Sequence, residues 1–199
     1  MTAANNRGFL LIISGPAGVG KTTLCERLVE CYPSLQRLVT TTTRKPRDGE
    51  VDGIDYHFLT KDEFQHRMKD GAFIEWAKVH SNYYGSQRRH IEAVLESGND
   101  VLLNIDIQGA RAFRSKVEAA ENLDAGVLTV FIRPENIEQI KKRLIGRDLD
   151  SSEEIQRRLL TAEEELKAAD EFDHCIVSGS RDADFEAVRQ IYEKHRQNL

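Results

Sequence analysis

The 199-residue sequence has few of the features that mark secreted, membrane or zinc-binding proteins. Its three cysteines, Cys25, Cys31 and Cys175, are an odd number without a CxxC pair, which argues against a disulfide framework and favours a reducing compartment. The six histidines form no HExxH motif and no Cys/His cluster, so no structural zinc is indicated. There is no signal-peptide pattern, and no apolar run approaches the roughly 20 residues of a membrane span. We therefore expect a cytoplasmic protein with no membrane partner.

An excess of positive charge is also lacking. The net charge is −5 at pH 7, whereas a general nucleic-acid binder needs a basic face, so no nucleic-acid partner is expected. A local basic pocket for a small phosphate ligand remains compatible with this balance. Hydrophobic residues make up 40% and charged residues 31%, which is typical of one globular domain. Nothing in the chain implies an obligate protein partner.

What the sequence does contain is an alternation of apolar strands and amphipathic helices. This pattern predicts an α/β fold with a central parallel sheet covered on both faces. Residues between about 37 and 87 break the rhythm and look like an insertion of short mixed elements, including a helix that Thr60 and Glu63 would cap. We predict strands at 9–14, 38–42, 54–59, 73–79, 101–107, 127–132 and 174–177, and helices at 21–31, 86–97, 108–117, 134–144, 153–169 and 184–196.

The segment GPAGVGKT (15–22) matches the phosphate-binding P-loop pattern G-x-x-x-x-G-K-[ST]. It follows a predicted strand and opens a predicted helix, which is the context that the motif requires. Glycines let backbone N–H groups converge on phosphate oxygens, and the helix N-terminus adds a positive dipole. Lys21 would reach the β- and γ-phosphates, and the Thr22 hydroxyl would be a ligand of Mg²⁺. The residues assigned to ATP are Gly15, Pro16, Ala17, Gly18, Val19, Gly20, Lys21, Thr22 and Thr23.

A P-loop serves hydrolases as well as kinases, and only a kinase needs a second pocket for a phosphoryl acceptor. The inserted block offers candidates for that pocket. Arg44 and Arg47 suit bidentate phosphate binding, and the hydroxyls of Tyr56 and Tyr84 could reach the same group, although a charge cluster can also be a solvated face. Glu75 could accept hydrogen bonds from N1–H and N2–H₂ of guanine and would reject adenine, or it could lie on the outer side of a strand.

Four segments resemble the guanylate kinases: SGPAGVGKTT (14–23), TTRKPRDGEVDGIDY (42–56), FIEWAKVHSNYYGS (73–86) and NIDIQG (104–109). The resemblance covers nearly the whole chain. It implies a three-layer P-loop fold with a core (1–36, 88–145 and 170–199), a GMP-binding insertion (about 37–87) and a helical lid (about 146–158). Arg44, Arg47, Tyr56 and Tyr84 would hold the GMP phosphate, while Thr40, Glu75, Ser86 and Asp106 would bind guanine.

The resemblance also gives roles to arginines near the lid, where spacing alone allows ordinary salt bridges on a helix surface. Arg143, Arg147 and Arg158 are implied as catalytic residues together with Lys21, since phosphoryl transfer depends on positioning and charge neutralisation. The implied enzyme is a Mg²⁺-dependent ATP:GMP phosphotransferase that supplies precursors of GTP in purine recycling. The alternatives are a scaffold domain of the same fold without turnover and a related kinase with another acceptor.

Several residues depart from the pattern of the family that the chain resembles. Thr40 stands where a serine is usual, and Asp148 where a glycine often occurs. Ser178-Gly179-Ser180 replaces an Asn-Asp pair near the donor adenine, so donor choice could be looser than ATP alone. Asn104 replaces the first aspartate of Asp-x-Asp, and we expect it to face the site beside Asp106 at the end of one strand.

Overall fold

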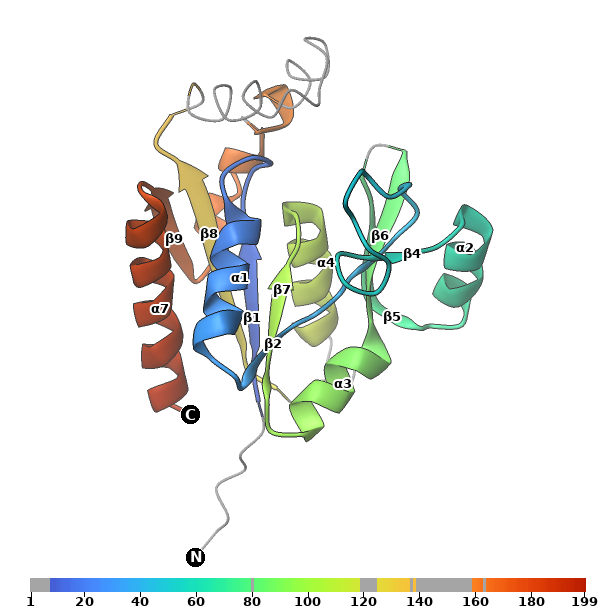
Figure 1. Ribbon diagram of the computed structural model, residues 1–199, viewed down its shortest axis with the longest axis horizontal. Coiled ribbons are helices and arrows are strands. Elements are labelled where there is room, and N and C mark those ends of the chain that lie inside the picture. The colour runs from blue at the N-terminus through green and yellow to red at the C-terminus, as the bar shows by residue number, and fades with distance from the viewer. Residues whose placement is uncertain (1–7, 80, 119–124, 137, 139–158, 163) are drawn as a thin grey trace, which may run out of the picture.

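The computed structural model describes residues 8–79, 81–118, 125–136, 138, 159–162 and 164–199 (Figure 1). Its main sheet has five parallel strands in the order β2-β7-β1-β8-β9. No helix within the described ranges is both long and apolar enough to cross a membrane. The elements of this core are β1 (Leu10–Ser14), α1 (Lys21–Cys31), β2 (Leu35–Arg37), α3 (Arg88–Glu96), β7 (Asp100–Asn104), α4 (Ile107–Glu118), β8 (Val127–Pro134), the 3₁₀ turn η1 (Ala169–Glu171), β9 (His174–Ser178) and α7 (Arg181–Gln197).

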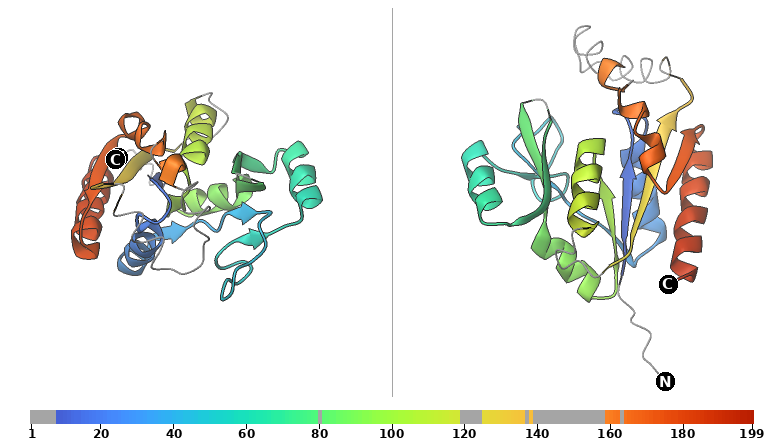
Figure 2. Two further views of the ribbon diagram at one scale, coloured as in Figure 1. Left: turned by 90° about the horizontal axis from the view of Figure 1, so that it is seen from above. Right: turned by 180° about the vertical axis from the view of Figure 1, so that it is seen from behind.

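The central strand β1 is buried along its whole length, because helices cover both faces of the sheet. Leu11 and Ile13 point into one apolar cluster, which they share with residues of α1 and α7. Leu10 and Ile12 point the other way, into a second cluster with residues of α3 and α4. Figures 1 and 2 show the resulting three layers. The α/β fold that the sequence predicts is therefore confirmed.

A second sheet lies beside the core and is built from the inserted block. Its four strands have the order β4-β3-β6-β5, with β5 and β6 antiparallel (Figure 2). The Thr60–Glu63 capping box starts its helix as predicted, and Phe64 of that helix stacks on Phe73 with ring centroids 4.4 Å apart. The elements are β3 (Thr41–Thr42), β4 (His57–Phe58), α2 (Lys61–Lys69), β5 (Phe73–Val79) and β6 (Asn82–Gln87).

At the amino-terminal edge of the core sheet, a buried carboxylate ties three elements together. Asp100 is 2% exposed and accepts hydrogen bonds from the Phe9 backbone N–H (3.1 Å) and the Tyr192 hydroxyl (2.6 Å), and it pairs with Arg196. Burial, reinforced by the bond to Asp100, raises the pKa of Tyr192 to about 12. This network fixes α7 against β7 and β1 at the edge opposite the P-loop.

Candidate active site

The P-loop, residues 15–22, joins β1 to α1 at the carboxyl edge of the core sheet. Its glycines are required by the backbone, since Gly15, Gly18 and Gly20 have φ values of 140°, 86° and 111°. At Gly15 a Cβ atom would lie 2.2 Å from the carbonyl oxygen of Ile132, so no other residue fits. Gly20 precedes α1 and offers no side chain to cap it. The first N–H groups of α1 are thus left to a ligand, as an anion site requires.

Two side chains at the start of α1 face this loop. The Lys21 Nζ atom donates hydrogen bonds to the carbonyl oxygens of Gly15 (2.5 Å) and Pro16 (3.0 Å), which folds the ammonium over the loop. The Thr22 hydroxyl is exposed in the first turn, and Nδ2 of Asn104 lies 3.5 Å from its Oγ1 atom. Asn104, the last residue of β7, therefore faces the phosphate loop.

The prediction that Thr22 is a ligand of Mg²⁺ can be tested against the donor atoms present. Mg²⁺ prefers oxygen ligands and is usually held by one or two protein groups together with waters and substrate phosphates. The Thr22 hydroxyl and the nearby amide of Asn104 satisfy that chemistry, and no cluster of three or more metal-binding side chains occurs among the described residues. The Thr22 hydroxyl therefore fits a Mg²⁺ ion that arrives with a nucleotide.

Three of the four side chains that we predicted to bind a phosphate, Arg44, Tyr56 and Tyr84, lie close together in the inserted block. The guanidinium of Arg44 lies 5.4 Å from the ring centroid of Tyr56, whose ring in turn lies 6.2 Å from that of Tyr84. Glu50, which the sequence analysis missed, receives a 2.7 Å hydrogen bond from Nη2 of Arg44 and another of 2.7 Å from the backbone N–H of Arg47. Glu50 is the last residue of the segment RKPRDGE, and an acid so close to two arginines is the signal that could have identified it. The pairing raises the pKa of Arg44 and lowers that of Glu50.

The predicted base pocket lies between β5 and the start of α4. Glu75 is 4% exposed, and its Oε1 atom accepts a 2.6 Å hydrogen bond from the hydroxyl of the fully buried Ser86. A Cβ atom at Gly109 would lie 3.4 Å from both Oε2 of Glu75 and Oδ1 of Asp106. The two carboxylates therefore approach the same glycine. This arrangement excludes the alternative that Glu75 lies on the outer side of its strand.

The Glu75 carboxyl is electrostatically unusual. Burial raises its pKa to about 8, the nearby charge of Asp106 adds to the rise, and the hydrogen bond from Ser86 opposes it. At neutral pH the group is therefore mostly protonated in the free protein. A ligand that offers two donors to this carboxyl must displace that proton, because only the ionised form accepts on both oxygens.

A β-bulge in β5 turns two consecutive side chains, Ile74 and Glu75, toward α4. The register of β5 with β6 shifts between Phe73 and Glu75, so that Ile74 is the extra residue. Ile74 packs with Ala110 and Phe113 of α4, and Glu75, the next residue, also faces α4 through Gly109. In a regular strand these two consecutive side chains would point to opposite faces.

Asp106 differs from its predicted place. The strand that we predicted over 101–107 ends at Asn104, and Asp106 precedes α4, where its Oδ1 atom accepts a 2.8 Å hydrogen bond from the Gly109 N–H. The two polar residues therefore do not share a strand face: Asn104 faces the P-loop, whereas Asp106 caps a helix beside Glu75. The last side chain assigned to guanine, Thr40, is 8% exposed just before β3.

The lid arginines Arg143, Arg147 and Arg158 lie outside the described residues, as do Asp148 and the predicted lid, so their assignments stay predictions. At the other end of the site, Ser178-Gly179-Ser180 is described. Asp184, which the sequence analysis missed, accepts hydrogen bonds from the Ser178 hydroxyl (2.8 Å) and the Gly179 N–H (2.7 Å). A carboxylate from α7 thus supports this loop.

Known proteins resemble this chain in sequence and in fold. Residues 7–195 match the guanylate kinase family. Guanylate kinase of Wolbachia sp. subsp. Brugia malayi is 41% identical over 98% of the chain and 96% of its own length. That of Rubrobacter xylanophilus is 42% identical over 92% and 91%. The crystal structure of guanylate kinase from Anaplasma phagocytophilum superposes with a TM-score of 0.75 at 28% identity, covering 96% of this chain and 87% of that one.

Proposed function

The chain belongs to the guanylate kinase family and is a nucleoside monophosphate kinase, and from this premise we propose how its site divides between ATP and GMP. The reaction is transfer of the γ-phosphoryl group of ATP to GMP, which yields ADP and GDP. The observation that best supports separate sites for ATP and GMP is the buried pair Glu75–Ser86, which lies in the inserted block and not in the P-loop.

We assign the donor nucleotide to residues 15–23. The N–H groups of the first turn of α1 lack a side-chain cap and would bind the phosphates, to which Lys21 would add a positive charge. The ammonium already lies over the loop, on the carbonyls of Gly15 and Pro16, and must turn outward to bind phosphate oxygens. Such a turn costs little because the lysine side chain has several rotatable bonds.

We assign the acceptor to the inserted block and the start of α4. Arg44, Arg47, Tyr56 and Tyr84 would bind the GMP phosphate, and Thr40, Glu75, Ser86 and Asp106 would bind the base. Ionised Glu75 accepts from N1–H and N2–H₂ of guanine, which are adjacent donors. Adenine presents an acceptor at N1 and would leave the buried carboxylate with Ser86 as its donor but without the two donors of guanine, so discrimination should be strong.

Phosphoryl transfer from ATP to GMP needs no general base, because the GMP phosphate is already an anionic nucleophile. The protein positions the two phosphates and stabilises the charge that spreads over the transferring group. Lys21 is one source of that stabilisation, and the predicted Arg143, Arg147 and Arg158 would be the others. Thr22 would be the protein ligand of a Mg²⁺ ion bound with ATP, and the ion would supply further neutralisation of the phosphate charge.

A cytoplasmic location is part of the proposal. Cys31 and Cys175 are exposed and unpaired thiols, as expected in a reducing compartment, and Cys25 is a buried free thiol. The substrates ATP and GMP are the only partners that the proposal requires.

A coupled assay with ATP, Mg²⁺ and a panel of nucleoside monophosphates tests the proposal. Turnover with GMP at least about a hundredfold above AMP, CMP and UMP supports it. Preference for another monophosphate would instead indicate a related kinase with a different acceptor. Binding of GMP without turnover would indicate a domain that uses the fold for interaction alone.

A further inference from the structure

Helix α4 packs against the core on one of its faces. Ile107, Arg111 and Arg114 have the spacing at which side chains form a single stripe along a helix. Ile107 packs with Phe131 of β8 and Ala169 of η1, so this stripe faces the core sheet and the 3₁₀ turn beside it.

A different face of α4 meets β5 of the inserted block. Gly109 lies against the carboxylate of Glu75, and Ala110 belongs to the same apolar cluster as Ile74. Asp106 precedes the helix and accepts a 2.8 Å hydrogen bond from the Gly109 N–H. Because one helix carries both faces, whatever holds the core face in place also sets where the start of α4 meets the proposed guanine pocket.

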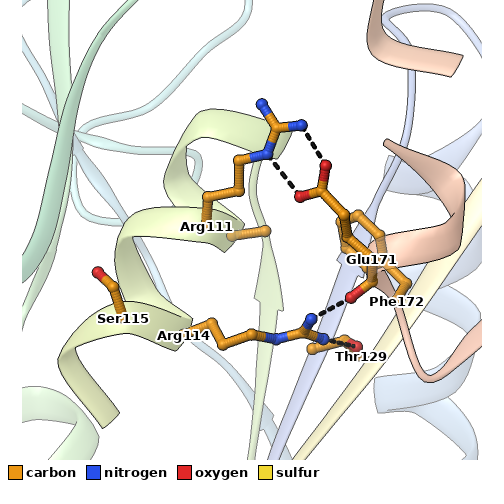
Figure 3. A pocket seen from close by; sticks show the side chains of 7 residues that line it. Arg111, Arg114, Ser115, Thr129, Glu171 and Phe172 are labelled. Carbon is orange, nitrogen blue, oxygen red and sulfur yellow. Dashed lines mark hydrogen bonds and ion pairs between the residues drawn. The ribbon is translucent and has the colours of Figure 1, made fainter. Parts of the chain in front are cut away.

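Glu171 joins the core face of α4 to η1 (Figure 3). Nε of Arg111 donates to Oε2 of Glu171 at 2.6 Å, and its Nη2 pairs with the other carboxylate oxygen, which makes the contact bidentate. Nη1 of Arg114 donates to the backbone carbonyl of Glu171. The cavity between these groups is about 130 Å³, well below the roughly 300 Å³ of small ligand pockets, so we interpret it as a joint between the two elements.

The joint is anchored in the sheet through its second arginine. Nη2 of Arg114 donates at 2.9 Å to the hydroxyl of Thr129, which is 2% exposed in β8. That hydroxyl donates to the carboxylate of Asp173 at 2.7 Å and accepts from the Asp173 N–H at 2.9 Å. The contacts of Glu171 therefore form part of a network, whereas an isolated surface ion pair would contribute little.

We propose that Glu171 is a positioning residue for the acceptor: through the two arginines it holds α4 against the core. The start of α4 then keeps Asp106 beside Glu75. The inference rests on the proposed assignment of these two carboxylates to guanine. Its consequence is that an ion pair in neither substrate site sets the affinity for GMP and leaves the donor site unaffected.

Steady-state kinetics and calorimetric titration of GMP test the proposal on the whole protein and its E171A and R111M variants. Each variant should raise the KM and the Kd for GMP about threefold to tenfold, while kcat and the KM for ATP stay within about twofold of wild type. The charge-swapped double variant R111E/E171R should bring both GMP constants back to within about twofold of wild type.

E186A is the matched control, because Glu186 also binds one arginine, Arg189 of α7, through both carboxylate oxygens. It should change neither GMP constant. E171A and E186A should both unfold within about 3 °C of wild type, since each breaks an exposed pair, so a loss of GMP affinity in E171A alone does not come from general instability.

Hydrogen exchange followed by NMR tests the path through α4. The N–H groups of Gly109 and Ala110 donate to the side chain and the backbone carbonyl of Asp106, at 2.8 and 2.9 Å. E171A should speed their exchange about threefold or more, and E186A should not.

Unchanged exchange in E171A, a GMP affinity equal to wild type, or a double variant no better than E171A would overturn the inference. Absence of GMP binding by the wild type would instead overturn the assignment of the guanine pocket, so the two failures are distinguishable.

Discussion

The amide of Asn104 and the hydroxyl of Thr22 lie 3.5 Å apart, which joins the end of β7 to the first turn of the P-loop helix. An amide nitrogen can only donate to the Thr22 oxygen, whereas a carboxylate would accept the hydroxyl proton and leave the oxygen lone pairs for a metal.

We therefore predict that N104D strengthens Mg²⁺ binding in the presence of ADP by about threefold to tenfold, with kcat changed by less than about threefold. Titration of the nucleotide complex with Mn²⁺, followed by electron paramagnetic resonance, measures the affinity without turnover. N99D, a control at the other end of β7, should leave it unchanged. A large loss of activity in N104D would mean that the site depends on the amide.

Removing the P-loop ammonium should separate chemistry from acceptor binding. K21A is expected to lower kcat by at least about a thousandfold, because the charge that stabilises the transferring phosphoryl group is lost. The Kd for GMP should stay within about twofold of wild type, since GMP is assigned to the inserted block. Stopped assays and calorimetry measure the two quantities, with K167A on the surface as control. Undiminished turnover in K21A would refute the mechanism.

The raised pKa of Glu75 makes GMP binding depend on pH. Only the ionised carboxylate accepts both guanine donors, so GMP affinity should rise between pH 7 and about pH 8 and then level off, with proton release on binding. The GMP phosphate is largely dianionic above pH 7 and contributes little to this change. Calorimetry in buffers with different ionisation enthalpies measures the released protons.

E75Q is the matched control: it should bind GMP weakly and without this pH dependence. Because the folded protein holds the Glu75 proton more tightly than the unfolded chain does, this group's contribution to stability falls as pH rises toward about 8. E75Q should therefore unfold at a higher temperature than wild type at pH 8. A GMP affinity of wild type that stays constant across this range would contradict the assignment of the guanine pocket.

Glu50 should position Arg44 for the GMP phosphate. E50Q removes the charge that anchors the guanidinium, and we expect the KM for GMP to rise about fivefold to tenfold with a smaller change in kcat. D48N removes an equal charge two residues earlier and should leave KM within about twofold. Equal effects of both variants would show that net charge of the loop, rather than the Arg44–Glu50 contact, sets the affinity.

The Asp100 network should matter for stability and not for chemistry, since it lies at the edge of the sheet opposite the P-loop. D100N is expected to lower the free energy of unfolding by about 2–3 kcal/mol, because buried partners lose a charged acceptor. Denaturant unfolding measures this change. D182N, which breaks an exposed pair with Arg27, should cost less than about 1 kcal/mol. Unaltered stability of D100N would contradict the role given to the network.

Elements with a strong local signal were predictable from the sequence. The helix at 21–31 and the strand at 73–79 have the bounds that we predicted, and the Thr60–Glu63 box starts α2. The final helix begins at Arg181 rather than at 184, because Ser180 accepts the cap bond from the Ala183 N–H. Local periodicity thus identified elements, while capping set their ends.

Elements that depend on pairing were missed. We predicted no strand between 73–79 and the helix at 86–97, but residues 82–87 form β6, a strand without an apolar run that exists because it pairs with both β3 and β5. The second core strand is at 35–37 rather than 38–42, where it pairs with β7. For the site, motifs brought out Lys21, Arg44 and Glu75, but not Glu50 or Asp184, because the role of each of these acids depends on a side-chain contact that no motif encodes.

The bulge at Ile74 gives the acceptor site a tolerance that side-chain chemistry does not show. Pairing with Ser86 sets the face of Glu75, and the surplus residue turns Ile74 toward the same helix, α4. Deleting Ile74 would remove an apolar anchor between β5 and α4 while the Glu75–Ser86 pair stays in register. The choice of base is thus set by the pairing of two strands, whereas the firmness of the site depends on how β5 packs against the core.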